Sequence, residues 1–138
     1  MPDMELWPTS RLLSTAARLV ELAWNDKLRP LGLTYPAVLT LDALATAGPI
    51  TPGDLARSVR VQAQTMGPLL TRLESRGYIR REPNRFDRRS QLVLITDLGL
   101  TLLEQSQNQE NNVLAAINLD SEDLREELLA IVRHTNFD

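Results

Sequence analysis

Apolar residues recur at spacings of three and four along four stretches of the first half of the chain, which predicts four helices with one buried face each. Local signals agree with this pattern. Thr34 and Thr51 are the expected N-caps of the second and third helices, and each is followed within two residues by a proline that fits a first helical turn. Pro30 and Gly48 are expected to end the helices before them. The four predicted helices cover residues 9–28, 34–48, 51–59 and 64–76.

The pattern changes after Gly77 to an alternation of apolar and polar residues. This alternation predicts two short strands, over residues 78–83 and 91–96. The segment between them, 84–90, contains Asn, Asp and Ser together with four charged residues. We therefore expect an antiparallel hairpin with a charged tip.

Helical spacing returns after the second strand. One long helix is expected from Asp97 to about Asn118, although its middle is a polar run of nine residues with little amphipathic character. A last helix is expected after Asp120, the predicted N-cap, because an acidic residue follows three positions later and leucines then recur at helical spacing. No repeat or linker divides the chain.

The composition is that of one globular domain. The chain has 138 residues, of which 43% are hydrophobic and only 4% aromatic, which favours aliphatic side chains packed on helices. We therefore expect a mainly α fold with a small two-stranded β wing. The first residues lack the basic and apolar regions of a signal peptide, and no stretch is apolar enough for a membrane helix. A cytoplasmic protein without membrane contact is expected.

Several kinds of catalytic site are excluded by missing residues. The chain has no cysteine, so it can form no disulfide, thiolate metal site or thiol nucleophile. Its single histidine, His134, can supply neither a cluster of histidine ligands nor a triad within one chain. No paired acid–base motif is present. We therefore expect a protein that is not an enzyme and has no metal or cofactor.

The charges are unevenly placed, although the net charge of −3 looks unsuited to nucleic acid. Residues 57–89 hold nine of the fifteen basic residues and only three acidic ones, a net charge of +6, whereas the rest of the chain carries −9. A basic segment on an acidic chain is typical of an element that binds a polyanion. Fourteen of the basic residues are arginine, which suits forked contacts to phosphates, although a GC-rich genome would give the same bias.

The order of elements within residues 34–96 predicts a winged helix-turn-helix. A short helix, a tight break and a longer helix are followed by a basic hairpin, and the longer helix of such a unit enters the major groove of DNA. Its polar side chains are expected to read bases, because Gln pairs with adenine and the Thr methyl group contacts thymine. The alternative is that they only solubilise an exposed helix. The candidates are Gln62, Gln64, Thr65, Thr71 and Arg72, with Thr51 and Arg57 of the shorter helix as supporting residues.

Pro68 is an irregularity in the longer helix, next to Gly67. A proline inside a helix cannot donate to the carbonyl four residues earlier, here that of Gln64, and it costs about 3 kcal/mol. Two arrangements are open. Either the helix is kinked at Pro68, or Gln64 lies at its very start.

The predicted wing contains the pattern Asp-x-Arg, followed by an apolar strand and Ile-Thr-x-x-Gly. The four residues that define this pattern are Asp87, Arg89, Thr96 and Gly99. With these residues, the segment 54–99 resembles the MarR family of bacterial regulators, whose hallmark is this wing pattern with Leu or Ile before the threonine. In the family the arginine reaches the minor groove and the aspartate orients it, so the resemblance implies these roles for Arg89 and Asp87. A hairpin whose charges serve only solubility is the alternative. The candidate wing residues are Arg85, Asp87, Arg88 and Arg89.

The resemblance covers nearly the whole chain and implies a homodimer. Its contacts would come from residues 9–30 and 97–138, beside a DNA-binding lobe over 34–96. Both segments carry more apolar residues than two flanking helices need, although these residues could instead complete the core of a single copy. They are Trp7, Leu12, Leu13, Ala16, Leu19 and Leu22 at one end, with Leu114, Ile117, Leu128, Leu129, Val132 and Phe137 at the other.

Two functions follow from these patterns. The first, which the resemblance implies, is a repressor that binds an inverted repeat in double-stranded DNA and responds to a small-molecule effector, for which the family implies a cleft between the dimer helices and the DNA-binding lobe. The second is a protein-interaction module whose basic face binds an acidic partner. The dependence of DNA binding on salt and on base sequence separates the two.

Overall fold

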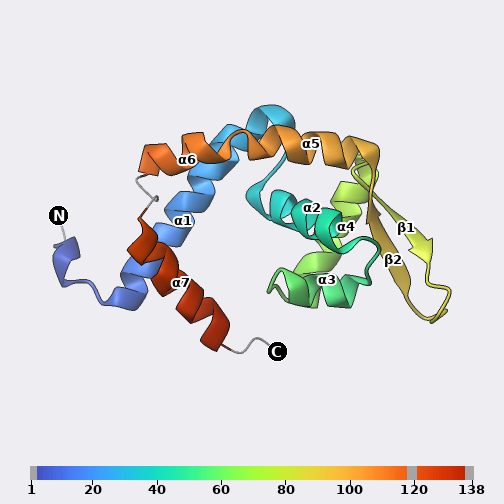
Figure 1. The fold of residues 1–138 in the computed structure, drawn as a ribbon, viewed down its shortest axis with the longest axis horizontal. Coiled ribbons are helices and arrows are strands. Elements are labelled where there is room, and N and C mark those ends of the chain that lie inside the picture. The colour runs from blue at the N-terminus through green and yellow to red at the C-terminus, as the bar shows by residue number, and fades with distance from the viewer. Residues whose placement is uncertain (1–2, 118–120, 136–138) are drawn as a thin grey trace.

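The computed structural model describes residues 3–117 and 121–135 and has the predicted fold class, mainly α with one two-stranded sheet. Figure 1 shows α1 and α7 at one end and the sheet at the other, with α5 and α6 running between them. Within the described ranges, we find no helix with both the length and the apolar character that a bilayer span requires. The elements are η1 Met4–Leu6, α1 Thr9–Leu28, η2 Arg29–Leu31, α2 Tyr35–Ala47, α3 Pro52–Ser58, α4 Ala63–Ser75, β1 Ile79–Pro83, β2 Gln91–Ile95, α5 Asp97–Gln107, α6 Glu110–Ile117 and α7 Glu122–His134.

The helix starts are set by side-chain caps. The predicted caps Thr34 and Thr51 are confirmed, because each Oγ1 accepts a hydrogen bond from the N–H three residues on, at 3.4 Å in α2 and 3.2 Å in α3. The cap of α5 is Thr96, which directly follows β2 in an extended conformation and accepts from the N–H of Gly99 with its Oγ1. The cap of α7 is Ser121. The predicted cap Asp120 lies outside the described residues.

The single helix expected from Asp97 to about Asn118 is wrong, because α5 ends at Gln107 and α6 begins at Glu110. The two helices follow one another in nearly the same direction (Figure 1). The break falls inside the polar run, where the N–H of Gln109 donates to the Ser106 carbonyl at 3.0 Å, a tighter turn than an α-helix makes. A polar run has too little apolar surface to hold one continuous helix against the core.

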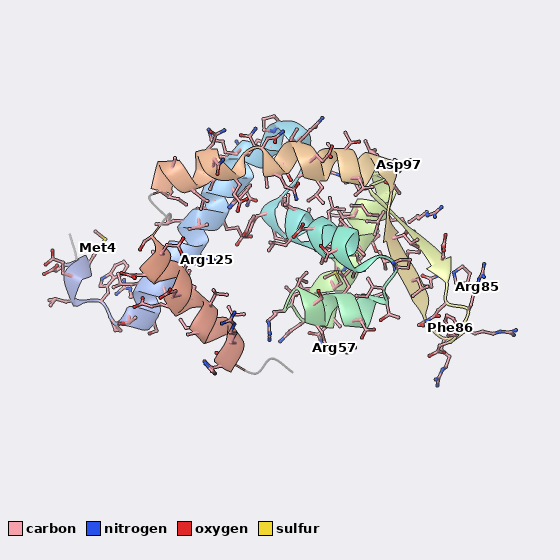
Figure 2. All side chains as sticks on the ribbon, in the orientation of Figure 1. Met4, Arg57, Arg85, Phe86, Asp97 and Arg125 are labelled. Atoms are coloured by element: carbon pink, nitrogen blue, oxygen red, sulfur yellow. The ribbon has the colours of Figure 1, made fainter. Side chains whose placement is uncertain are left out.

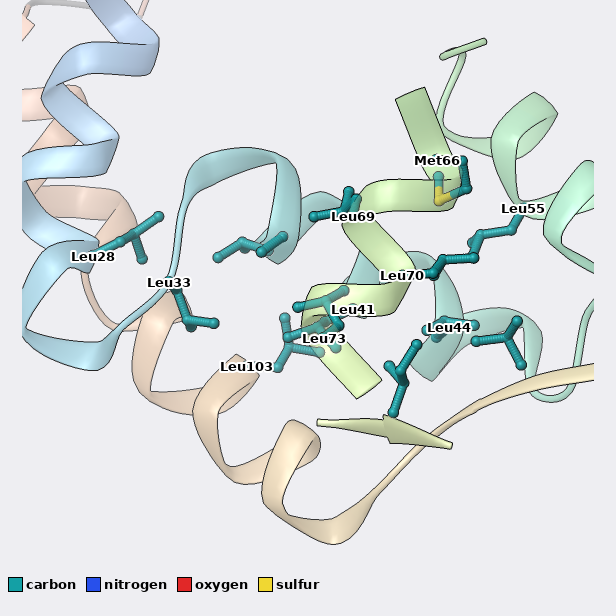
Figure 3. Close-up of a cluster of buried hydrophobic side chains, with 14 of the residues drawn as sticks. Leu28, Leu33, Leu41, Leu44, Leu55, Met66, Leu69, Leu70, Leu73 and Leu103 are labelled. Atoms are coloured by element: carbon teal, nitrogen blue, oxygen red, sulfur yellow. The ribbon is translucent and has the colours of Figure 1, made fainter. Parts of the chain in front are cut away.

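The core lies between α2, α3 and α4. Figure 3 shows side chains of these helices meeting in one cluster, in which Leu41, Leu44, Leu55 and Leu70 are at most 1% exposed. Burial of one such side chain contributes about 1.5–3 kcal/mol, so this cluster is a main source of stability. The predicted buried stripe of the fourth helix is confirmed, and it consists of Met66, Leu69, Leu70 and Leu73.

The two strands form the predicted antiparallel hairpin, with Ile79 opposite Ile95 at its base and Pro83 opposite Gln91 near its tip. A third segment, which the alternation did not predict, pairs with the outer edge of β2. The N–H of Ile50 donates to the Val93 carbonyl at 3.2 Å, and the N–H of Val93 donates back at 2.8 Å. This bridge joins the wing to the loop before α3 and so fixes its base against the helical core.

A tight contact holds the start of α5 against the turn after α4. The Oγ1 of Thr96 donates to the Gly77 carbonyl at 2.6 Å and accepts from the N–H of Gly99 at 3.1 Å. A Cβ atom on Gly99 would collide with the Tyr78 carbonyl oxygen and lie 2.8 Å from Cγ1 of Ile95. The Thr-x-x-Gly pattern therefore has a physical cause, since only a glycine lets α5 approach the backbone this closely.

Candidate nucleic-acid interface

The turn between α3 and α4 is closed by a residue in the left-handed conformation. Arg60 has φ = +59°, and no other non-glycine residue of the described ranges has a positive φ. Its N–H donates to the Arg57 carbonyl at 3.2 Å, and the N–H of Val61 donates to the Ala56 carbonyl at 3.0 Å. This is the helix ending that glycine usually supplies, and an arginine there costs on the order of 1 kcal/mol. Sequence reasoning missed Arg60, because nothing in the residue pattern indicates its φ.

The two predicted supporting residues, Thr51 and Arg57, make their contacts within α3. Thr51 caps the helix. Arg57 lies on the outer side of α3 (Figure 2), where its guanidinium pairs with the Asp54 carboxylate on an exposed surface. Among the hydrogen bonds of the described residues, none joins the Asp54 carboxylate to the Thr51 backbone N–H. An exposed pair of this kind adds little stability.

Helix α4 exposes the face opposite to its buried stripe. Gln62 is the N-cap residue and makes no capping hydrogen bond with its side chain, so its amide group is available to a partner. Gln64 and Thr65 lie in the first turn and are exposed. Thr71 and Arg72 continue the exposed side two turns later. The structure therefore places all five predicted residues of this helix on its solvent side.

Pro68 does not interrupt α4, which runs from Ala63 to Ser75 with Gln64 as its second residue. The hydrogen bond that Pro68 cannot donate is therefore the one to the carbonyl of Gln64, an exposed residue of the first turn. Gly67 is exposed as well, and a Cβ atom placed on it would meet nothing within 4 Å. The packing of this protein therefore requires neither a glycine nor a proline at these positions.

Arg81, on β1, ties the wing to α4 and was missed by sequence reasoning. Its Nη2 lies 3.5 Å from Oγ1 of Thr71, and its Nε lies 3.5 Å from Oε1 of Glu74. The Thr71 hydroxyl also donates to the Gly67 carbonyl at 3.2 Å, so it is engaged within the protein. One signal was available, since Arg81 is two residues from the buried Ile79 and therefore on the same side of the strand.

The tip of the wing is an ordered turn. The N–H of Asn84 donates to the Ser90 carbonyl at 3.3 Å, and the Asn84 side-chain amide donates to Oγ of Ser90 at 3.0 Å. Oδ1 of Asp87 accepts from the backbone N–H of Arg89 at 3.0 Å and from its Nε at 3.2 Å. These two hydrogen bonds, the backbone one above all, hold the pKa of Asp87 below its usual value of 3.8.

The arginines of the tip point into solvent. The Arg89 side chain is 92% exposed although Asp87 orients it, so its remaining donors are free to bind a ligand. Arg85 and Arg88 are exposed too. In Figure 2 Arg85 and the neighbouring Phe86 project from the hairpin, away from the helices. The tip thus presents three cations on a turn whose backbone is hydrogen-bonded.

The opposite end of the molecule is apolar. Nine of the thirteen large hydrophobic side chains that are exposed in the described ranges belong to η1, α1 or α7. Helix α7 has no buried residue at all within those ranges. Of the predicted dimer residues, Trp7 is partly covered by the Arg11 guanidinium, 3.7 Å from its ring centre, Ile117 packs against the core, and Phe137 lies outside the described residues. The exposed set is Met4, Leu6, Leu12, Leu13, Leu19, Leu22, Leu128, Ile131 and Val132.

Two cavities lie at the apolar end and next to it. One, of about 140 Å³, lies between α2 and α5, and the other, of about 610 Å³, lies between α1, α6 and α7. Both are lined by Trp24, Tyr35 and Glu110. The rings of Trp24 and Tyr35 stack with centres 5.3 Å apart. Burial raises the pKa of the Tyr35 hydroxyl, and the nearby carboxylates of Glu110 and Glu21 raise it further.

The chain is similar to known regulators over most of its length. Residues 31–90 match the model described as MarR family. The multiple antibiotic resistance protein MarR of Salmonella typhimurium is 33% identical over 101 residues, which are 73% of this chain and 70% of that protein. The HTH-type transcriptional regulator MgrA of Staphylococcus aureus is 29% identical over 115 residues, 83% and 78% of the two chains. A crystal structure of a MarR mutant from E. coli in complex with operator DNA superimposes with a TM-score of 0.81 at 27% identity, over 95% of this chain and 96% of that one.

Proposed function

The chain belongs to the MarR family and is a DNA-binding transcriptional regulator, and we propose that it acts as a homodimeric repressor on an inverted repeat. One observation carries the proposal. The exposed polar face of α4 and the oriented arginine of the wing tip belong to one lobe, tied together by Arg81. A helix for the major groove and a hairpin for the adjacent minor groove are the parts that a winged helix-turn-helix needs. Two copies related by a two-fold axis would read half-sites about 10 base pairs apart.

Base reading is assigned to the start of α4. Gln62 and Gln64 offer amide groups that can pair with adenine, and the methyl group of Thr65 suits thymine. Arg72, on the flank of the exposed side, is assigned to a phosphate. Thr71 is assigned a positioning role and not the expected contact with a base, because its hydroxyl is engaged by Arg81 and by the Gly67 carbonyl.

The wing supplies the minor-groove contact and much of the charge. Asp87 holds the guanidinium of Arg89 in place before DNA arrives, so less conformational entropy is lost on binding. A narrow A·T-rich minor groove concentrates negative potential, which favours entry of that guanidinium. Arg85 and Arg88 are assigned to phosphates at the tip, and Arg60 to a phosphate beside the start of α4.

The dimer is assigned to the apolar end. The many exposed apolar side chains of α1 and α7 are unfavourable in water, and a second copy would cover them. The segments 9–30 and 97–138 therefore remain our dimerisation segments, and 34–96 the DNA-binding lobe.

Effector control is assigned to the two cavities around Trp24 and Tyr35. The smaller lies between α2 of the lobe and α5, and the larger lies among the dimerisation helices against Tyr35 of the lobe, so a small molecule bound in either would change the angle between these helices and the lobe. The distance between the DNA-binding lobes of the two copies would change with that angle. The affinity of the dimer for an inverted repeat of fixed spacing would then fall.

The remaining proposals follow from the family. The relatives named above are regulators and not enzymes, which supports a role without catalysis. A regulator of transcription must reach the chromosome, so we propose a cytoplasmic location.

Selection of bound duplexes from a random-sequence library, followed by binding at two salt concentrations, tests this function. We expect an inverted repeat, two chains per duplex and an affinity that falls steeply with salt. Binding without sequence preference, or one chain per duplex, would contradict the proposal. Sequence-independent binding with the same salt dependence is the result expected of a basic face that serves an acidic protein partner.

A further inference from the structure

Phe86 is the most exposed large hydrophobic side chain in the described ranges, with 97% of its surface accessible to solvent. It lies at the tip of the wing, far from the apolar end that we assign to the dimer (Figure 2). Three arginines surround it in sequence, Arg85, Arg88 and Arg89. The cations suit a polyanionic partner. The exposed aromatic ring among them suits a polyanion that also offers stacked or apolar surfaces with which the ring can make contact.

The position of Phe86 is set by the turn. Its backbone N–H donates to Oδ1 of Asn84 at 3.0 Å, and the N–H of the next residue, Asp87, donates to the Asn84 carbonyl at 3.3 Å. These bonds order the backbone on both sides of the ring, and nothing in the core requires the ring. The fold thus holds an apolar side chain outward at the point that extends furthest from the helices (Figures 1 and 2).

We propose that Phe86 is an apolar wedge, which the wing inserts into the minor groove of DNA, where it partly unstacks one base step. The inference rests on the proposed DNA binding and adds a residue to it. Proteins that enter the minor groove combine cationic side chains with such wedges, and Phe is among the residues they use. Phe86 and Arg89 are three positions apart on one turn. The Arg89 guanidinium would therefore bind in the minor groove next to the base step that the Phe86 ring unstacks.

The wedge carries a prediction about sequence preference. Pyrimidine–purine steps such as TA and CA unstack most easily, so the duplexes selected by the wild-type protein should carry such a step beneath each wing. Because the contact is apolar, it releases no counterion. Its loss should therefore weaken binding without changing the salt dependence, which separates it from the loss of an arginine.

The experiment compares wild type, Phe86→Ala and Phe86→Trp on the tightest duplex that the wild-type protein selects from a random library. A 2-aminopurine base, which brightens when it unstacks, is placed at each position beneath the wing in turn. Leu98→Ala is the matched control, since it truncates another exposed apolar side chain, 50% accessible, on α5. Thermal unfolding checks that each variant folds, and we expect no change for Phe86→Ala because the ring is outside the core.

For Phe86→Ala we expect an affinity about tenfold lower for each wing, in the range that alanine substitution of a base-stacking aromatic gives, with the salt slope unchanged. The 2-aminopurine signal should rise with wild type and with Phe86→Trp, and not with Phe86→Ala. Leu98→Ala should match wild type. Equal affinity of Phe86→Ala and wild type, or an affinity loss with no 2-aminopurine signal from wild type, would overturn the wedge. Absence of any selected sequence for the wild type would instead overturn the proposed function.

Discussion

The two ends of the molecule differ in how far their apolar side chains are buried. In the lobe, α2 and α4 bury five and four residues, respectively, and the exposed face of α4 is mostly polar. At the other end, α1 buries only Trp24 and Leu28, and the described part of α7 buries none. Leucine and isoleucine side chains there face solvent.

We propose from this difference that the lobe is stable within one chain, whereas the exposed apolar side chains of α1 and α7 are covered by a second copy. Stability and dimerisation are then separate properties, carried by different residues. DNA binding depends on both, because the lobe supplies the contacts and the dimer places two lobes on one duplex. Substitutions should separate these properties, and the following ones are ordered by the size of the expected effect.

Removal of residues 121–138 tests the apolar end most strongly. We expect a folded lobe that no longer dimerises, with an affinity for the selected inverted repeat lower by about 10²–10⁴-fold, because the second half-site no longer binds within the same complex. Sedimentation and binding measure the two effects. Ile131→Asp should reproduce them in the full chain, and Glu126→Ala, on the same helix, is the control. An unchanged dimer after truncation would show that the apolar end does not carry the association.

Gly99→Ala tests the lobe. The added Cβ collides with the Tyr78 carbonyl, and a backbone oxygen cannot turn away as a flexible side chain can. We expect a free energy of unfolding lower by about 2–3 kcal/mol, measured with urea. Gly53→Ala is the matched control, because a Cβ atom there meets nothing within 4 Å. Equal stability of the two variants would contradict the tight contact between α5 and the turn after α4.

Arg89→Ala tests DNA contact alone. We expect specific binding weaker by about 1–3 kcal/mol and a salt slope smaller by about one for each wing, with dimerisation unchanged. Arg125→Ala, an arginine of α7, should leave both binding quantities as they are. If the affinity fell while the salt dependence stayed equal to that of the wild type, Arg89 would not be bound among the phosphates of the groove.

Asp87→Ala should also weaken binding, although it removes a negative charge, because Arg89 loses the carboxylate that orients it. The depressed pKa of Asp87 means that this carboxylate is charged at neutral pH, and its interaction is lost only as the pH falls below 3.8, through the lowered pKa. Titration of Asp87 should therefore cause no change in DNA affinity with pH between pH 5 and pH 7. Tighter binding by Asp87→Ala would contradict the orienting role.

Pro68→Ala separates stability from readout within α4. The variant restores one helical hydrogen bond and should raise the free energy of unfolding by about 2 kcal/mol. If the proline shapes the helix for the groove, the ratio of specific to non-specific affinity falls at the same time, and this is the result we expect. A more stable protein with an unchanged ratio would show that Pro68 has no role in readout.

Gly67→Ala is the smallest and most local change. An alanine is better in a helix by up to about 1 kcal/mol, and the structure leaves room for its methyl group. We expect a small gain in stability and weaker specific binding, because the methyl group would lie on the face that approaches DNA. Unchanged binding would indicate that Gly67 does not come close to the duplex.

Most of the elements could be predicted from the sequence because their determinants are local. The apolar spacing predicted α1 with its observed bounds, Thr9–Leu28, and threonine caps predicted the starts of α2 and α3. The break between α5 and α6 could not be placed in this way. A polar run is compatible with a helix or a turn, and contacts with the rest of the chain decide between them.

The features of the candidate site also fall into two groups, those that the sequence predicts and those that only the structure shows. By itself the sequence determined the starts of α1, α2 and α3, the buried stripe of α4, the basic segment and the polar residues at the start of α4, because each depends on residues close together in the chain. Only the tertiary structure decided the left-handed Arg60, the bridge from Ile50 to β2, the tie from Arg81 to Thr71 and the exposure of Phe86. These features depend on which segments meet in space and which residues are left without a neighbour. The packing of the whole chain determines which segments meet and which residues lack a neighbour. Neither can be predicted from a local sequence pattern.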